Sequence, residues 1–136
     1  MQKKILAAPI AAVVSIVLAA IFLGMETKEV AKEPEVIPNL VSITVSSSRP
    51  GCEESNTCYF PYEIVIYQGE SVTWKNDDSA FHTVTSGYYD EPDGMFDSGQ
   101  LDAAETFSRK FEEGGFYDYY CRLHPWMKGT VVVKFT

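Results

Sequence analysis

From residue 40 onward, the sequence is a succession of short β-type segments separated by turn signals. The segments alternate apolar and polar residues or are rich in β-branched and aromatic residues, and this part of the chain shows no helical periodicity. They cover residues 40–46, 63–68, 71–76, 81–86, 105–111, 116–121 and 129–135. Short strands with turn signals at close spacing are typical of a β-sandwich or barrel, so the sequence predicts an all-β domain.

The connections between these segments include two tight turns and one long excursion. Gly69-Glu70 and residues 112–115 are turn signals between neighbouring segments. Residues 87–101 are acidic and contain several glycines. We expect them to form a surface excursion between strands, with at most a short turn of helix.

The N-terminus differs in composition from the rest of the chain. Two lysines precede an apolar run at residues 5–23, and a helix of this length spans about 28 Å, close to the hydrocarbon thickness of a bilayer. Residues 1–25 are therefore expected to be a hydrophobic signal or anchor helix. The absence of a small-x-small cleavage site before Met25 favours an anchor, and a cleaved signal peptide is the alternative.

This leader predicts both the location of the protein and its domain organisation. Lysines before the apolar run place the N-terminus in the cytoplasm and the rest of the chain outside it, either anchored or secreted. Residues 26–39 are charged and contain proline without an apolar face, so we interpret them as a tether. Residues 40–136 form the expected folded domain.

The expected domain is strongly acidic. It contains seven Lys or Arg and fifteen Asp or Glu, which gives it a net charge of −8. Binding to nucleic acid is disfavoured, because phosphate neutralisation needs clustered basic residues. The charge favours a protein partner with a basic surface, and the alternative is that it serves only solubility.

The three cysteines cannot all pair with one another. Cys52 and Cys58 enclose a short polar loop, and in an exported domain this spacing predicts a local disulfide. Cys121 is left over, and an unpaired cysteine outside the cell needs protection or a function.

Cys121 begins a Cys-x-x-His-x-x-Met motif with His124 and Met127. Taken singly, the three residues are ordinary core or loop residues. Together in one loop they offer a thiolate, an imidazole and a thioether, a set of donors that suits copper and suits zinc poorly. The second imidazole that such a copper site needs is available only from His82, the other histidine of the chain.

Two stretches give the chain a resemblance to a known family. "QGESVTWKNDDSAFHTVTS" (residues 68–86) resembles the strand, loop and first histidine ligand of the cupredoxins, the type 1 or blue copper proteins. "GGFYDYYCRLHPWMKGTVVV" (residues 114–133) resembles their ligand loop and final strand, with the spacing closest to the amicyanin and plastocyanin group. The resemblance implies a cupredoxin-like Greek-key β-sandwich or barrel that binds one copper ion.

The resemblance also assigns roles to individual residues. The implied copper ligands are His82, Cys121, His124 and an axial Met127. Asn76 corresponds to an asparagine outside the ligand shell whose hydrogen bonds tie the two ligand loops together. Pro125 and Trp126 flank the exposed histidine and are expected to form the surface on which partners dock, although Trp126 alternatively only covers the copper.

The implied function is the transfer of single electrons between redox protein partners outside the cytoplasm. The alternative is a single-copper redox enzyme with an open coordination position, acting on a small molecule such as nitric oxide, nitrite or oxygen. A second, catalytic copper is disfavoured because the first uses both histidines. A copper-storage protein is disfavoured because the chain has one compact donor set rather than an array.

Overall fold

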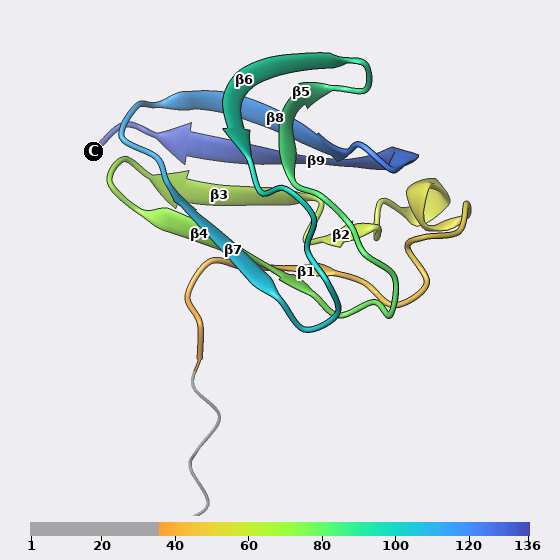
Figure 1. The fold of residues 1–136 in the computed structure, drawn as a ribbon. Coiled ribbons are helices and arrows are strands. Elements are labelled where there is room, and N and C mark those ends of the chain that lie inside the picture. Colours follow the sequence, from red (N-terminus) through yellow and green to blue (C-terminus); the bar gives the residue numbers. More distant parts are fainter. Residues whose placement is uncertain (1–35) are drawn as a thin grey trace, which may run out of the picture. The chain divides into compact units, whose positions relative to one another are not determined.

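The computed structural model describes residues 36–136, which form one unit (Figure 1). The expected signal or anchor at residues 1–25 and most of the expected tether at 26–39 lie outside the described residues. Within the described residues, no helix is long and apolar enough to cross a membrane.

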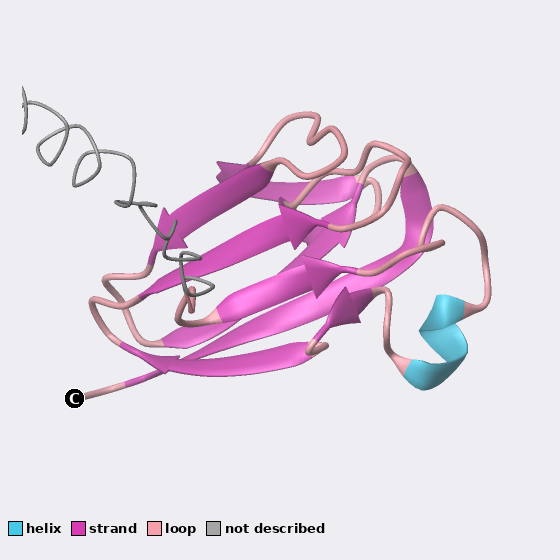
Figure 2. Cartoon of the chain, turned by 90° about the horizontal axis from the view of Figure 1, so that it is seen from below, coloured by secondary structure: helices cyan, strands magenta, loops and turns pink. Residues whose placement is uncertain are grey.

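The described part is a sandwich of two β-sheets, as the sequence predicts. The first sheet has the order β2-β1-β4-β7 and the second has the order β3-β9-β8-β5-β6. The strands are β1 (Leu40–Ile43), β2 (Tyr59–Phe60), β3 (Glu63–Tyr67), β4 (Ser71–Asn76), β5 (Thr85–Tyr88), β6 (Glu91–Asp97), β7 (Thr106–Lys110), β8 (Gly115–Cys121) and β9 (His124–Lys134). The single helical element of residues 36–136 is a 3-10 turn, η1 (Cys52–Ser55), which lies to one side of the strands (Figure 2).

Two of the expected segments that differ from the structure lie between β4 and β7. The strand expected at residues 81–86 begins only at Thr85, because the chain around His82 crosses from one sheet to the other and makes a single bridge to Leu101. The excursion expected at residues 87–101 contains strand β6, which pairs antiparallel with β5, and no helical turn. Gly87 permits this pairing, since a Cβ there would lie 2.4 Å from the carbonyl oxygen of Glu91.

Alternation along the strands places one set of side chains between the two sheets. On β4 the buried side chains are Val72, Trp74 and Asn76, which is the period of two that a half-buried strand requires. Trp74 is completely buried, and its ring lies 5.7 Å from that of Phe107 and 5.3 Å from that of Tyr119. Burying each large apolar side chain of this kind contributes about 1.5–3 kcal/mol.

The β8–β9 hairpin forms the base of the candidate site. The strands pair antiparallel from Gly115 opposite Val133 to Cys121 opposite His124. Arg122 and Leu123 form the turn between them. The hairpin therefore places two of the residues singled out in the sequence directly opposite each other.

Candidate metal centre

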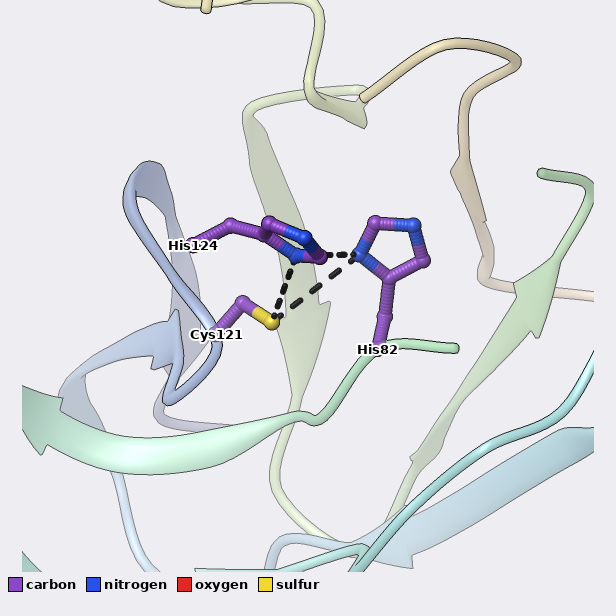
Figure 3. Close-up of side chains that lie close together, drawn as sticks. All are labelled: His82, Cys121 and His124. Atoms are coloured by element: carbon purple, nitrogen blue, oxygen red, sulfur yellow. Dashed lines mark hydrogen bonds between the residues drawn. The ribbon is translucent and has the colours of Figure 1, made fainter. Parts of the chain in front are cut away.

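His82, Cys121 and His124 point toward one another at one end of the sandwich (Figure 3). The Nδ1 atoms of the two histidines are 3.1 Å apart. The Sγ atom of Cys121 lies 3.5 Å from Nδ1 of His124 and 3.9 Å from Nδ1 of His82. Two nitrogens and one sulfur thus form a small triangle.

The triangle brings local and distant parts of the sequence together. Closure of the β8–β9 hairpin supplies Cys121 and His124. His82 arrives from the segment that crosses between the sheets, where its backbone N–H donates to the carbonyl of Leu101 and its carbonyl accepts from the N–H of Leu101. His82 and Cys121 are both fully buried, whereas His124 is partly exposed.

Met127 lies on the face of β9 that packs into the core. The burial pattern of β9 alternates, and Met127 is followed on the inward face by Gly129, Val131 and Val133. Met127 is completely buried and belongs to the same core cluster as Cys121. It is placed as an inward-facing residue three positions beyond His124.

The surroundings of Cys121 favour its thiolate form. Burial alone would raise the pKa of the Cys121 thiol, but hydrogen bonds from His82 and from backbone N–H groups lower it below its ordinary value. One of these donors is the N–H of Thr83, 3.3 Å from the sulfur. Burial and the neighbouring His82 lower the pKa of His124, so its imidazole tends to be neutral. A thiolate and a neutral imidazole are the forms that bind metal.

Asp78 makes a contact with His82 that the sequence did not suggest. Its Oδ2 atom lies 3.0 Å from Nε2 of His82, the ring nitrogen that points away from the triangle. Its side chain is 3% exposed, so Asp78 cannot belong to the solvated acidic surface. Burial alone would raise the pKa of Asp78, but hydrogen bonds from His82 and backbone N–H groups keep it well below its usual value.

Asn76 is buried and braces the backbone around His82. Its amide nitrogen donates to the carbonyls of Ala80, at 2.8 Å, and Leu101, at 3.0 Å. Its side-chain bonds therefore lie on the His82 side of the site. The link to the other ligand loop is made by Thr83, whose N–H reaches Cys121 and whose hydroxyl accepts the N–H of Arg122 at 2.9 Å.

The expected docking residues lie beside His124. Pro125 is exposed, whereas Trp126 is partly buried and packs against the core. The Trp126 ring centre lies 5.3 Å from that of His124, and its indole N–H donates to the carbonyl of Ser47 at 2.9 Å. Trp126 thus lies beside His124 and is hydrogen-bonded to the turn that contains Ser47.

The expected disulfide between Cys52 and Cys58 is present. It closes the loop that contains η1, and the hydroxyl of Ser47 donates to the carbonyl of Cys58 at 3.0 Å. The remaining cysteine, Cys121, is free and buried.

The donor set fits copper. A point equidistant from the three triangle atoms lies about 2 Å from each, the usual length of a bond from a metal to imidazole or thiolate. Two histidines and one cysteine around a trigonal position, with a methionine nearby, are the ligands of blue-copper electron-transfer sites. Zinc fits less well, because a thioether is not among its usual ligands.

The profile of a family described as "Copper binding proteins, plastocyanin/azurin family" matches residues 48–134. This range contains both strands of the ligand hairpin, the His82 segment and all four predicted ligands. The chain belongs to this family of cupredoxins, and its cofactor is a single copper ion.

Individual relatives agree with the family match. Amicyanin-alpha of Methylorubrum extorquens is 42% identical over 74 residues, which are 53% of this chain and 60% of the relative. Plastocyanin of Scenedesmus fuscus is 30% identical over 62% of this chain and 94% of the relative. A solved structure titled a novel purple cupredoxin from Nitrosopumilus maritimus is 33% identical, with a TM-score of 0.64 over 70% of this chain and 98% of its own.

The match to the amicyanins is partial. The chain spans 55–60% of the length of the three amicyanins to which it is similar. The matches establish the copper-binding domain, and the activity of the whole protein is a matter for proposal.

Proposed function

We propose that this protein carries single electrons between redox protein partners, using one copper ion held by His82, Cys121, His124 and Met127. The triangle of two imidazole nitrogens and one thiolate sulfur, all within 3.9 Å of one another, carries the proposal. Bound copper supplies one-electron chemistry by alternating between Cu(I) and Cu(II). The amicyanin and plastocyanin relatives support this function.

The protein holds the donor atoms in positions that suit both Cu(I) and Cu(II). Cys121 and His82 are fully buried and hydrogen-bonded, so their side chains have little freedom to move. His124 alone among the triangle residues is partly exposed, and it provides the route for electrons between the site and a partner.

We place partner docking at Pro125 and Trp126, next to the exposed edge of His124. Pro125 lines two neighbouring hollows, one with Trp126 and Glu53 and the other with Tyr88 and Tyr89. Aromatic side chains therefore lie on both sides of Pro125, and aromatic residues are enriched at protein interfaces.

Two variants of Trp126 separate docking from covering. Trp126→Phe loses the hydrogen bond to Ser47 but keeps an aromatic ring, whereas Trp126→Ala loses both. If Trp126 docks partners, the bimolecular electron-transfer rate falls for the alanine variant and stays near the wild-type rate for the phenylalanine variant. Equal rates for both variants and the wild-type protein would remove Trp126 from docking, and an equal fall for both would assign the effect to the lost hydrogen bond to Ser47 instead of to docking.

We also propose that the protein works outside the cytoplasm. The Cys52–Cys58 disulfide supports this location, since disulfides persist in oxidising compartments. The lysine-flanked apolar run at residues 5–23 supports export in the same way. The proposal also includes a membrane anchor formed by that run and a partner with a basic surface. Fractionating cells that express the protein with and without the run would test the location and the anchor.

The first experiment is a titration of residues 36–136 with Cu(II), followed by visible and electron paramagnetic resonance spectra. We expect one equivalent to give intense thiolate-to-copper absorption, and Cys121→Ser to abolish it. Absence of that absorption in the wild-type protein would refute the copper function.

Addition of azide then distinguishes the carrier from an enzyme. A spectrum that azide leaves unchanged indicates a closed site, as electron transfer requires. A shift with azide would indicate an open coordination position and favour a single-copper redox enzyme acting on a small molecule such as nitric oxide, nitrite or oxygen.

A further inference from the structure

The carboxylate of Asp78 accepts hydrogen bonds at both of its oxygens. Its Oδ1 atom accepts the backbone N–H groups of Ser46 and Ser79, each at 2.9 Å. Its Oδ2 atom accepts the N–H of Ser48, at 3.2 Å, and faces Nε2 of His82 at 3.0 Å. Only an ionised carboxylate accepts at both oxygens without donating, so the surroundings specify the charged form.

The contact fixes which nitrogen of His82 carries the proton. A charged carboxylate at Nε2 requires a proton on that nitrogen, so in the neutral, metal-binding form of His82 the electron-pair donor is Nδ1. Nδ1 is the atom that faces Cys121 and His124. Asp78 therefore both orients the ring and makes its metal-facing nitrogen more basic.

We propose that Asp78 is a positioning residue that strengthens the donation of His82 to copper and thereby lowers the reduction potential of the site. The proposal rests on the proposed function, because it assumes that His82 holds copper. The physical reason is that a negative charge next to the imidazole stabilises the more highly charged Cu(II) more than Cu(I).

The Thr44–Ser48 turn holds Asp78 in place. Ser46 and Ser48 of this turn donate to the carboxylate, and Ser47 between them accepts the indole N–H of Trp126. This one turn is thus connected to His82 through Asp78 and to the neighbourhood of His124 through Trp126. The carboxylate is fixed by backbone groups rather than by mobile side chains.

The test compares Asp78→Asn with Asp77→Asn in the copper-loaded protein. Asp77 is the adjacent residue, but its carboxylate bonds Ser42 and Lys75 and does not contact His82. Both variants remove one negative charge from the same turn. We expect Asp78→Asn to weaken Cu(II) binding about 10–100-fold, in the range of other partners of metal-ligating histidines, with a smaller effect on Cu(I).

The reduction potential is the decisive measurement. A tenfold loss of affinity confined to Cu(II) raises the potential by about 59 mV. A role in structure alone would weaken both oxidation states alike and leave the potential unchanged. Equal potentials for the two variants would overturn the inference while leaving the copper function intact, whereas a wild-type protein without thiolate absorption would refute the copper function itself.

A second measurement needs no variant, because an amide at position 78 would face backbone donors and could disrupt folding. In the Cu(I) form of the wild-type protein, nitrogen-15 NMR reports the protonation of each ring nitrogen of His82. We expect a proton on Nε2, shifted downfield by the carboxylate and slow to exchange with solvent. An unprotonated Nε2 would overturn the inference.

Discussion

Asp77 and Asp78 are neighbours of identical chemistry that occupy opposite environments. Asp77 is exposed and forms an ion pair with Lys75 at 2.7 Å, whereas Asp78 is buried against His82. Both contribute to the net charge of −8 that suggested a partner with a basic surface, but the side chain of Asp78 is only 3% exposed and lies outside the charged surface. The spacing of four residues before a histidine ligand was the one signal available, and it means little outside a helix.

Met127 offers the clearest residue-scale prediction. Replacing Met127 by Leu conserves most of the side-chain volume, so we expect stability to fall by less than about 1.5 kcal/mol. We expect thiolate absorption to remain, since Cys121 is untouched, and the reduction potential to rise because the weak axial donor is lost. Voltammetry measures the change, with Met95→Leu as control because Met95 is 49% exposed. Equal potentials in the two variants would argue against Met127 as a ligand.

At the scale of elements, the β8–β9 hairpin is the part of the site that sequence reasoning reached most directly. The Cys-x-x-His spacing places both residues at the closed end of an antiparallel pair. The strand expected at 129–135 instead begins at His124, so His124 and Met127 belong to β9 rather than to a loop. Regular pairing therefore fixes the ligand backbone more firmly than the sequence suggested.

Gly129 tests how closely this hairpin is packed. It lies opposite Tyr119, and an added Cβ would come within 2.4 Å of the Tyr119 ring. Tyr119 is buried and cannot move freely, so we expect Gly129→Ala to destabilise the copper-free protein by about 1–3 kcal/mol. Chemical unfolding measures the change. Tyr119→Leu combined with Gly129→Ala should recover part of the loss, and an undiminished loss in the double variant would assign the effect to the backbone.

At the scale of the whole molecule, acidic side chains lie close to the proposed docking surface beside His124. The β5–β6 hairpin carries exposed Asp90 and Glu91, and the adjacent Tyr88 and Tyr89 line the same hollow as Pro125. Acidic side chains therefore stand next to the proposed docking surface. The overall charge of −8 has the same sign.

This arrangement predicts opposite salt effects for small oxidants of opposite charge. Rising salt should slow the oxidation of the Cu(I) protein by a cationic complex and speed its oxidation by an anionic complex, because attraction and repulsion are both screened. Stopped-flow absorbance measures both rates. Neutralising Asp90 and Glu91 should reduce the salt dependence more than neutralising Glu112 and Glu113. Those two control residues precede β8 at the end away from Cys121, about 20 Å along the strand.

The sequence predicted most of the sandwich because its strands carry local signals. Alternation located β4 and β8, and Gly69-Glu70 marked the turn between β3 and β4. Strand β6 was missed because its side chains are almost all exposed, which leaves no apolar alternation to detect. The roles of Asp78 and Thr83 were also missed, because they depend on the contact between segments that lie far apart in the chain.

The two-residue turn at Arg122-Leu123 has a consequence for how the protein matures. Cys121 and His124 come together through a local hairpin, whereas His82 is 39 residues away from Cys121. A chain that has formed only this hairpin already presents a two-donor chelate. Copper that met the chain at that stage would have two of its donors, and the arrival of His82 would add the third.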